Sequence, residues 1–189
     1  MLKISLAQSF NFSSFSFTSI RLTNIFNIFK KDKKSNISIG LDNISLQIFK
    51  GDRIGIVGES GSGKSVMTSA ILNDVPETLN ITSGSVEFDN QDILQLSQLQ
   101  LNKLRGARIS MIYQEPMAAL NPSIRVGKQV DEGFALHRPE IDPKDRKKET
   151  LKLLEQMKLP TPDRIYSSYA HQVSGGQCQR IVIAMALAC

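Results

Sequence analysis

Cysteine is scarce in this sequence. The two cysteines, Cys178 and Cys189, give neither a disulfide framework nor the spacing of a metal site. Such sparse use of cysteine suits a reducing compartment. We therefore expect a cytosolic protein.

The sequence also lacks a long apolar run. The longest stretch, residues 181–189, is far shorter than the roughly 20 residues needed to span a bilayer. Residues 1–19 contain no acidic side chain, but polar residues such as Ser5 and Gln8 interrupt any signal-peptide core. We interpret residues 1–18 as an N-terminal extension and expect membrane association only through a partner.

Acidic residues are few at the start of the chain. Residues 1–50 hold seven lysines and arginines against two aspartates, which accounts for the whole formal net charge of +5. The remainder is neutral, and the local run KKDKK is typical of a solvated loop. This distribution argues against a nucleic-acid partner.

Hydrophobic patterns predict a mixed α/β fold. Alternation over residues 20–29 and 37–49 predicts an antiparallel strand pair, and residues 83–93 predict a further hairpin strand. The runs RIGIVG (53–58) and ARISMIYQ (107–114) are typical of strands buried on both faces of a parallel sheet.

Helical periodicity follows the first apolar run and dominates the second half of the chain. Residues 64–72 predict one helix, and residues 122–172 predict several more. The clearest begins at Asp142, which suits an N-cap, with Pro143 in the first turn. Its apolar face carries Leu151, Leu154 and Met157. Pro160 and Pro162 are expected to end it.

The segment GESGSGKS matches the phosphate-loop pattern G-x-x-x-x-G-K-[ST]. Its glycines permit a tight loop whose amides converge on phosphate oxygens at the start of a helix. Lys64 can reach the β and γ phosphates, and Ser65 offers a hydroxyl to Mg²⁺. The candidate nucleotide contacts are Gly58, Glu59, Ser60, Gly61, Ser62, Gly63, Lys64 and Ser65. This loop, called the P-loop below, still leaves kinases, GTPases and many ATPases open.

Two further elements narrow the choice among the classes of P-loop protein. VSGGQ, with Ser174, Gly175, Gly176 and Gln177, places a second set of amides at a helix start. Gln114 ends the run ARISMIYQ, where its amide could contact Mg²⁺ or a water near the γ-phosphate.

In this order and spacing, GESGSGKS, YQ and VSGGQ resemble the ATP-binding subunits of ABC transporters over about residues 19–189. QEPMAALNP and SSYAHQVSGGQCQRIVIAMALAC resemble the oligopeptide and dipeptide importer branch, which includes ATPases for nickel and glutathione uptake. The resemblance implies an ABC ATPase core with an antiparallel β subdomain and a helical subdomain at about 117–172. A P-loop kinase would leave VSGGQ without a role.

The resemblance also implies roles and partners. Two ATPase domains would pack head to tail, so that VSGGQ, called the signature below, closes on the Mg-ATP held by the partner's P-loop. Gln114 would sense the γ-phosphate, and Lys64 would act in catalysis. Phe29 is the candidate to stack on adenine; a core position for Phe29, or Phe26 as the stacking residue, are the alternatives. The helical subdomain would receive a coupling helix of an integral-membrane permease at the cytoplasmic face of the inner membrane.

The sequence departs from the family pattern at three places. Ala170 stands where proline is common, and Cys178 stands where arginine is common. The Walker B strand ending in Asp-Glu and the later switch histidine are not found in the 189 residues. We therefore expect a C-terminally incomplete domain that does not hydrolyse ATP alone, or a non-catalytic remnant that binds nucleotide weakly or not at all. His171 is interpreted as a structural or surface residue.

Overall fold

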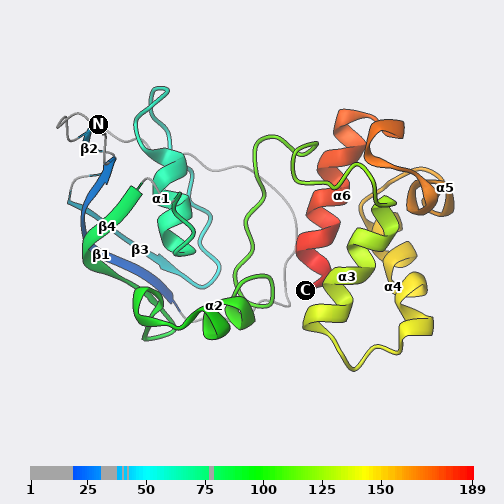
Figure 1. The fold of residues 1–189 in the computed structure, drawn as a ribbon, viewed down its shortest axis with the longest axis horizontal. Coiled ribbons are helices and arrows are strands. Elements are labelled where there is room, and N and C mark those ends of the chain that lie inside the picture. Colours follow the sequence, from blue (N-terminus) through cyan, green and yellow to red (C-terminus); the bar gives the residue numbers. More distant parts are fainter. Residues whose placement is uncertain (1–18, 31–37, 40, 42, 77–78) are drawn as a thin grey trace. The chain divides into compact units, whose positions relative to one another are not determined.

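The computed structural model describes residues 19–30, 38–39, 41, 43–76 and 79–189, drawn in Figure 1. The chain forms two compact units, which divide between Leu101 and Asn102. Its elements are, in chain order, β1 (Ser19–Lys30), β2 (Ser38–Ile39), β3 (Ile44–Phe49), α1 (Lys64–Ile71), β4 (Leu79–Phe88), β5 (Gln91–Asp92), α2 (Gln98–Leu104), α3 (Val126–His137), α4 (Pro143–Gln156), α5 (Pro162–Ser167) and α6 (Gly175–Ala188), with short 3₁₀ turns at Ile93–Gln95 and Ala170–Gln172.

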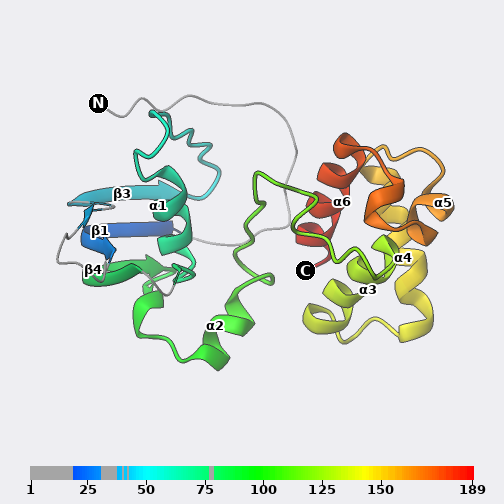
Figure 2. The same ribbon diagram turned by 45° about the horizontal axis from the view of Figure 1, so that its top comes forward.

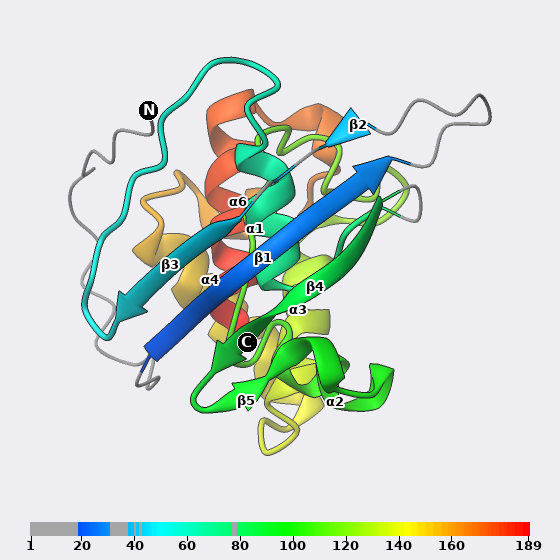
Figure 3. The ribbon, with the colours of Figure 1, turned by 90° about the vertical axis from the view of Figure 1, so that its left-hand side faces the viewer.

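The first unit contains an antiparallel sheet built around β1. Strand β1 pairs with β3 and β2 along one edge and with β4 along the other, as Figure 3 shows. Side chains of β3 alternate between half-buried and exposed, which is the period-two pattern of a strand with one packed face. The predicted antiparallel pairing of residues 20–29 with 37–49 is confirmed, with the second run divided into β2 and β3.

The predicted hairpin at residues 83–93 is also confirmed. Strands β4 and β5 are joined by Asp89 and Asn90, whose φ angles are 49° and 64°. Two successive residues with positive φ make the type I′ turn that matches the twist of antiparallel strands. Asp92 then accepts a hydrogen bond from the Leu94 amide at 3.0 Å and starts the following 3₁₀ turn.

Helix α1 contributes to the core of this unit. Leu22 of β1 and Val86 of β4 are cross-strand partners and are almost completely buried. Met67 and Ala70 of α1 are buried as well, and α1 contacts β4. This packing holds α1 in place and therefore fixes the N-terminal end of the helix, which the P-loop precedes.

The strand predictions for residues 53–58 and 107–114 are wrong. Both runs lie outside the strands of the structure, and single bridge positions occur only at Val57 and Ile109 within them. Val57 is 48% exposed and Tyr113 is 52% exposed. A parallel strand requires hydrogen-bonding neighbours distant in sequence, and no strand among the described residues forms a ladder with either run.

The second unit is helical, as residues 122–172 predict. Helix α3 contacts α4, α5 and α6, which are drawn in Figure 2. The core is centred on α6, whose residues Cys178, Ile181 and Ala184 have no exposed surface. Helix α6 packs against α3 and α4.

Helix α4 matches its predicted limits closely. Asp142 accepts a hydrogen bond from the Lys144 amide at 2.8 Å, and Pro143 occupies the first turn. Leu154 and Met157 are buried in the core, whereas Leu151 is only partly buried against it.

None of the helices in the described part of the chain has the length and apolar character that a membrane span requires.

Gly127 of α3 lies close against the ring of Tyr166 in the helical unit. A Cβ atom built at Gly127 of α3 would overlap the ring of Tyr166 of α5. We predict that Gly127→Ala lowers the free energy of unfolding by about 1–3 kcal/mol, because overpacking displaces the Tyr166 ring. Urea unfolding followed by circular dichroism measures this loss. Gly176→Ala is the control, since its Cβ would meet nothing within 4 Å; an equal loss in both variants contradicts the packing argument.

Candidate nucleotide-binding site

The P-loop takes a conformation that requires glycine at two positions. Gly61 and Gly63 have φ angles of 80° and 86°, in the left-handed region that side chains disfavour. Gly63 is the N-cap residue of α1. The chain therefore turns sharply into the helix at Lys64, as the motif predicts.

Gly58 has a different constraint. A Cβ atom at Gly58 would lie 2.6 Å from the Ser62 Oγ, so a side chain there would require the Ser62 side chain to move. The Ser62 amide donates to the Glu59 carbonyl at 3.2 Å and closes a turn within the loop. Gly58 and Ser62, the first and fifth residues of the P-loop, therefore lie close together in a compact loop.

The start of α1 is left open to an anion. Helix α1 has no side-chain hydrogen bond at its N-cap and no acidic residue in its first turn. The first amides of any α-helix have no acceptor within the helix, and the helix dipole makes this end positive. These amides therefore suit phosphate oxygens.

The Lys64 ammonium lies over the same loop. It donates to the Gly58 carbonyl at 2.8 Å, to the Glu59 carbonyl at 2.6 Å and to the Ser62 Oγ at 3.2 Å. Lys64 therefore adds a full positive charge to the end of α1 where the open amides lie. Ser65 follows with an exposed hydroxyl, the type of hard oxygen ligand that Mg²⁺ prefers.

The signature forms the start of α6. The Ser174 Oγ accepts from the Gln177 amide at 3.3 Å, and the Gln177 Oε1 accepts from the Ser174 amide at 2.9 Å. This reciprocal pair is a capping box. It occupies two of the four donors at the helix start and leaves the amides of Gly175 and Gly176 without an intrahelical acceptor.

The two signature glycines are exposed and unconstrained by packing. A Cβ atom at Gly175 or Gly176 would meet nothing within 4 Å. The fold of this unit therefore does not require glycine at these positions. Close approach of another molecule to the backbone is a sufficient reason for them.

The other residues singled out in the sequence, Gln114, Phe29 and His171, lie in different parts of the structure. Gln114 is exposed in a bend of the second unit, so its predicted contact with the γ-phosphate stays a prediction. Phe29 lies in β1 with its backbone opposite Ile39 and Asn80, but its side chain lies outside what the structure describes. His171 is exposed and stacks on Tyr169 with ring centroids 5.7 Å apart, in agreement with a surface role.

Cys178 is part of the core rather than of the signature surface. It has no exposed surface, and its Sγ lies 3.0 Å from the Met117 Sδ. Burial raises the pKa of its thiol above the ordinary value. Among the described residues, no group of three or more His, Cys, Asp and Glu side chains could hold a metal ion.

Comparison with known proteins identifies the family. A profile described as "ABC transporter" matches residues 41–189. The chain belongs to the ABC transporter family. This ABC transporter chain is 44% identical over 147 residues to the dipeptide transport ATP-binding protein DppD of Bacillus subtilis (strain 168), a match covering 77% of this chain and 44% of the relative.

Further relatives carry similar names. The oligopeptide transport ATP-binding protein OppD of Bacillus subtilis (strain 168) is 40% identical over 146 residues, covering 77% of this chain and 42% of OppD. A dimeric structure of the ATP-binding cassette MJ0796, described as a post-hydrolysis state bound to ADP and Pi, has a TM-score of 0.74 at 29% identity. That match covers 89% of this chain and 69% of the other. The chain thus spans less than half the length of these two curated relatives.

The ABC transporter chain also contains a buried polar network that the sequence patterns missed. Asp131 of α3 accepts from the Thr150 Oγ1 of α4 at 2.7 Å and from the Tyr166 hydroxyl of α5 at 2.6 Å. Lys128 donates to the same carboxylate at 3.2 Å. The sequence does carry one indication of this network, because the acidic Asp131 follows Val130 on a helix that faces the core.

The network has a defined pH dependence. The proximity of Tyr166 and the hydrogen bond to Asp131 raise the pKa of Lys128. Burial, followed by the Asp131 hydrogen bond, raises the pKa of Tyr166. Both shifts favour the protonated form in the folded state. Their stabilising contribution is therefore present at neutral pH and is lost as the pH rises through the raised pKa values of Lys128 and Tyr166.

Gln129 anchors the loop that leads into α3. Its Oε1 accepts from the Asn121 amide at 2.8 Å, and its Nε2 donates to the carbonyls of Asn121 at 3.1 Å and Ile124 at 2.8 Å. This buried amide fixes residues 121–124, which follow the segment carrying Gln114.

We predict that Thr150→Val lowers the free energy of unfolding by about 1–3 kcal/mol at neutral pH. The change keeps the shape of the side chain but removes a hydrogen-bond donor from the buried Asp131 carboxylate. Chemical unfolding measures the loss. Ser167→Ala at the exposed end of α5 is the control and is expected to stay within about 0.5 kcal/mol. No difference between the two variants contradicts a stabilising role for the network.

Proposed function

We propose that this chain is the ATP-binding part of an ABC importer that couples ATP binding and hydrolysis to uptake of peptides or similar small solutes. The observation that carries the proposal is the open start of α1, where two left-handed glycines and the Lys64 ammonium prepare a site for polyphosphate. The names of the dipeptide and oligopeptide transport relatives support the substrate class.

The P-loop residues fit Mg-ATP by the chemistry of their donors. Amides of the loop and of the first turn of α1 would hold phosphate oxygens, and Lys64 would neutralise the β and γ phosphates. The Ser65 hydroxyl would bind Mg²⁺, with Gln114 as a further oxygen ligand. Mg²⁺ would offset charge on the transferring phosphoryl group. Phe29 is proposed to stack on adenine.

The signature supports assembly into a pair of ATPase domains. Gly175 and Gly176 offer free amides on an exposed helix start, and the fold gives no packing reason for glycine there. We propose that this surface closes on the nucleotide held by the P-loop of a second ATPase domain. The dimeric MJ0796 cassette supports such an arrangement by its likeness to this chain.

An integral-membrane permease is the proposed second partner. The helical segment at residues 117–172 would receive its coupling helix at the cytoplasmic face of the membrane. Apolar side chains that the structure leaves exposed in and near this segment include Tyr113, Met117 and Ile124. Their exposure supports a protein contact on this part of the unit.

One observation favours weak nucleotide binding as the alternative. The P-loop follows residues 53–57, which form no ladder with any strand in the described part of the chain. A loop held from α1 alone is less rigid than one held from both ends. Weak affinity for Mg-ATP would therefore favour a non-catalytic role.

Isothermal titration of the chain with Mg-ATP tests the proposal. We predict measurable binding that Lys64→Ala weakens at least 10-fold, because a charge-assisted bond to phosphate is removed. Lys103→Ala, a lysine in the last turn of α2, is the matched control and is expected to bind like the original chain. No heat with the original chain, or equal binding by both variants, overturns the proposal.

A further inference from the structure

Helix α4 carries a surface that the proposed function does not use. Lys144, Lys148 and Lys152 recur every four residues and therefore lie along one face of the helix. All three side chains are exposed. They extend over about 12 Å along the axis, at 1.5 Å per residue. We call these three side chains the lysine row.

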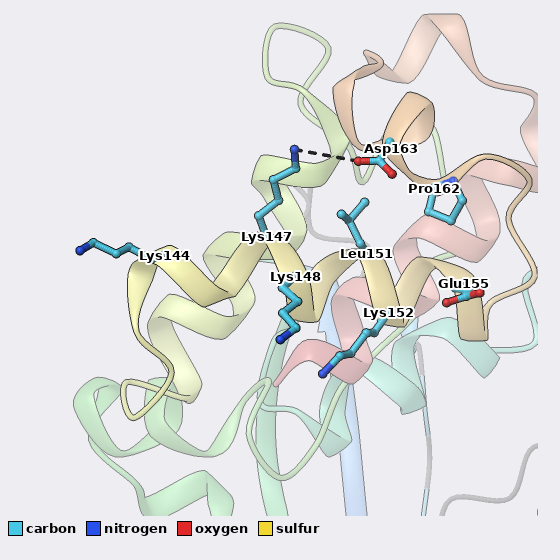
Figure 4. A pocket seen from close by; sticks show the side chains of 8 residues that line it. All are labelled: Lys144, Lys147, Lys148, Leu151, Lys152, Glu155, Pro162 and Asp163. Atoms are coloured by element: carbon cyan, nitrogen blue, oxygen red, sulfur yellow. Dashed lines mark ion pairs between the residues drawn. The ribbon is translucent and has the colours of Figure 1, made fainter.

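The lysine row borders an open pocket of about 590 Å³. Figure 4 shows Lys148 and Lys152 directed to one side of α4, whereas Lys147 turns toward Asp163 of α5. The residues that line the pocket are Lys144, Lys147, Lys148, Leu151, Lys152, Glu155, Pro162 and Asp163.

Most of the positive charge in the lysine row is not neutralised locally. Lys152 pairs with Glu149 at 2.7 Å. Among the described residues, Lys144 and Lys148 take part in no ion pair within 4 Å. Arg146 adds a further cation to α4, and its buried Nε has no hydrogen-bond partner in the described part of the chain.

Repulsion within the lysine row opposes the helix that carries it, because like charges four residues apart repel. Lys144 lies in the first turn of α4, where a cation also opposes the helix dipole, although Asp145 in the same turn offsets part of this effect. The ion pair of Lys152 with Glu149 offsets part of the repulsion. A bound anionic surface would relieve the remainder.

We propose that the lysine row binds the anionic phospholipid headgroups of a membrane surface. Lysine is depleted in protein interfaces, where aromatic residues and arginine dominate, whereas clusters of cations on a helix suit anionic lipids. The side chain of Leu151, half-buried beside the row, adds a small apolar contact. This surface lies away from the P-loop in sequence, and its binding does not require nucleotide.

Cosedimentation of the full chain with vesicles tests the inference. The probe is a vesicle of phosphatidylcholine and phosphatidylglycerol, and a vesicle of phosphatidylcholine alone is the neutral reference. We predict salt-sensitive binding to the anionic vesicle. Combined Lys144→Gln, Lys148→Gln and Lys152→Gln weakens this binding on the order of 100-fold, or roughly fivefold for each lysine.

The matched control removes the same charge elsewhere. Lys31→Gln, Lys33→Gln and Lys34→Gln neutralise the basic run near the N-terminus. This variant is expected to keep most of the vesicle binding. Equal losses in both triple variants overturn the inference, because net charge would then decide binding. Unchanged binding by the α4 variant, or no binding by the original chain, also overturns it.

A soluble acidic peptide separates lipid from protein as the occupant. If a polyglutamate peptide binds the lysine row more tightly than the anionic vesicle does, the lipid assignment is wrong. Thermal unfolding of the α4 variant serves as the folding check, and little change in stability is expected, because relief of repulsion offsets loss of the exposed Lys152–Glu149 pair. Titration of that variant with Mg-ATP separates this test from the proposed function, since the P-loop is unaltered.

Discussion

Backbone amides at the start of α1 are left without a side-chain acceptor, and the proposed nucleotide site is built on them. Gly63 ends the loop in a left-handed conformation and cannot itself cap the helix. By contrast, Asp142 caps α4 and satisfies the Lys144 amide. The start of α1 lacks the stabilisation that a side-chain cap would provide, and its amides remain available to an anion. The Lys64 ammonium adds positive charge at the same place.

The two units support this chemistry in different ways. In the first unit, the packing of Met67 and Ala70 holds α1 against the sheet and thereby fixes the direction of the P-loop amides. In the second, the buried Asp131 joins three helices around the core that α6 enters. The capping box at Ser174 then presents Gly175 and Gly176 at the exposed end of α6.

Local signals in the sequence predicted much of this. The P-loop, the Asp142 cap and the hairpin at Asp89 and Asn90 depend on residues close in sequence, so their conformations follow from residue type. The strands proposed at 53–58 and 107–114 failed because a parallel strand depends on distant neighbours. The contact of Asp131 with Thr150 and Tyr166 joins three separate helices, and the pattern of one helix does not specify such partners.

Amide hydrogen exchange at the start of α1 reports whether phosphate occupies these amides. If phosphate binds the open helix start, saturating Mg-ATP slows exchange in a peptide covering residues 61–66, and Lys64→Ala abolishes most of this protection. A peptide from α4 serves as the internal reference and should exchange at the same rate with and without nucleotide. Unchanged exchange at residues 61–66 under conditions where nucleotide is bound would contradict the account.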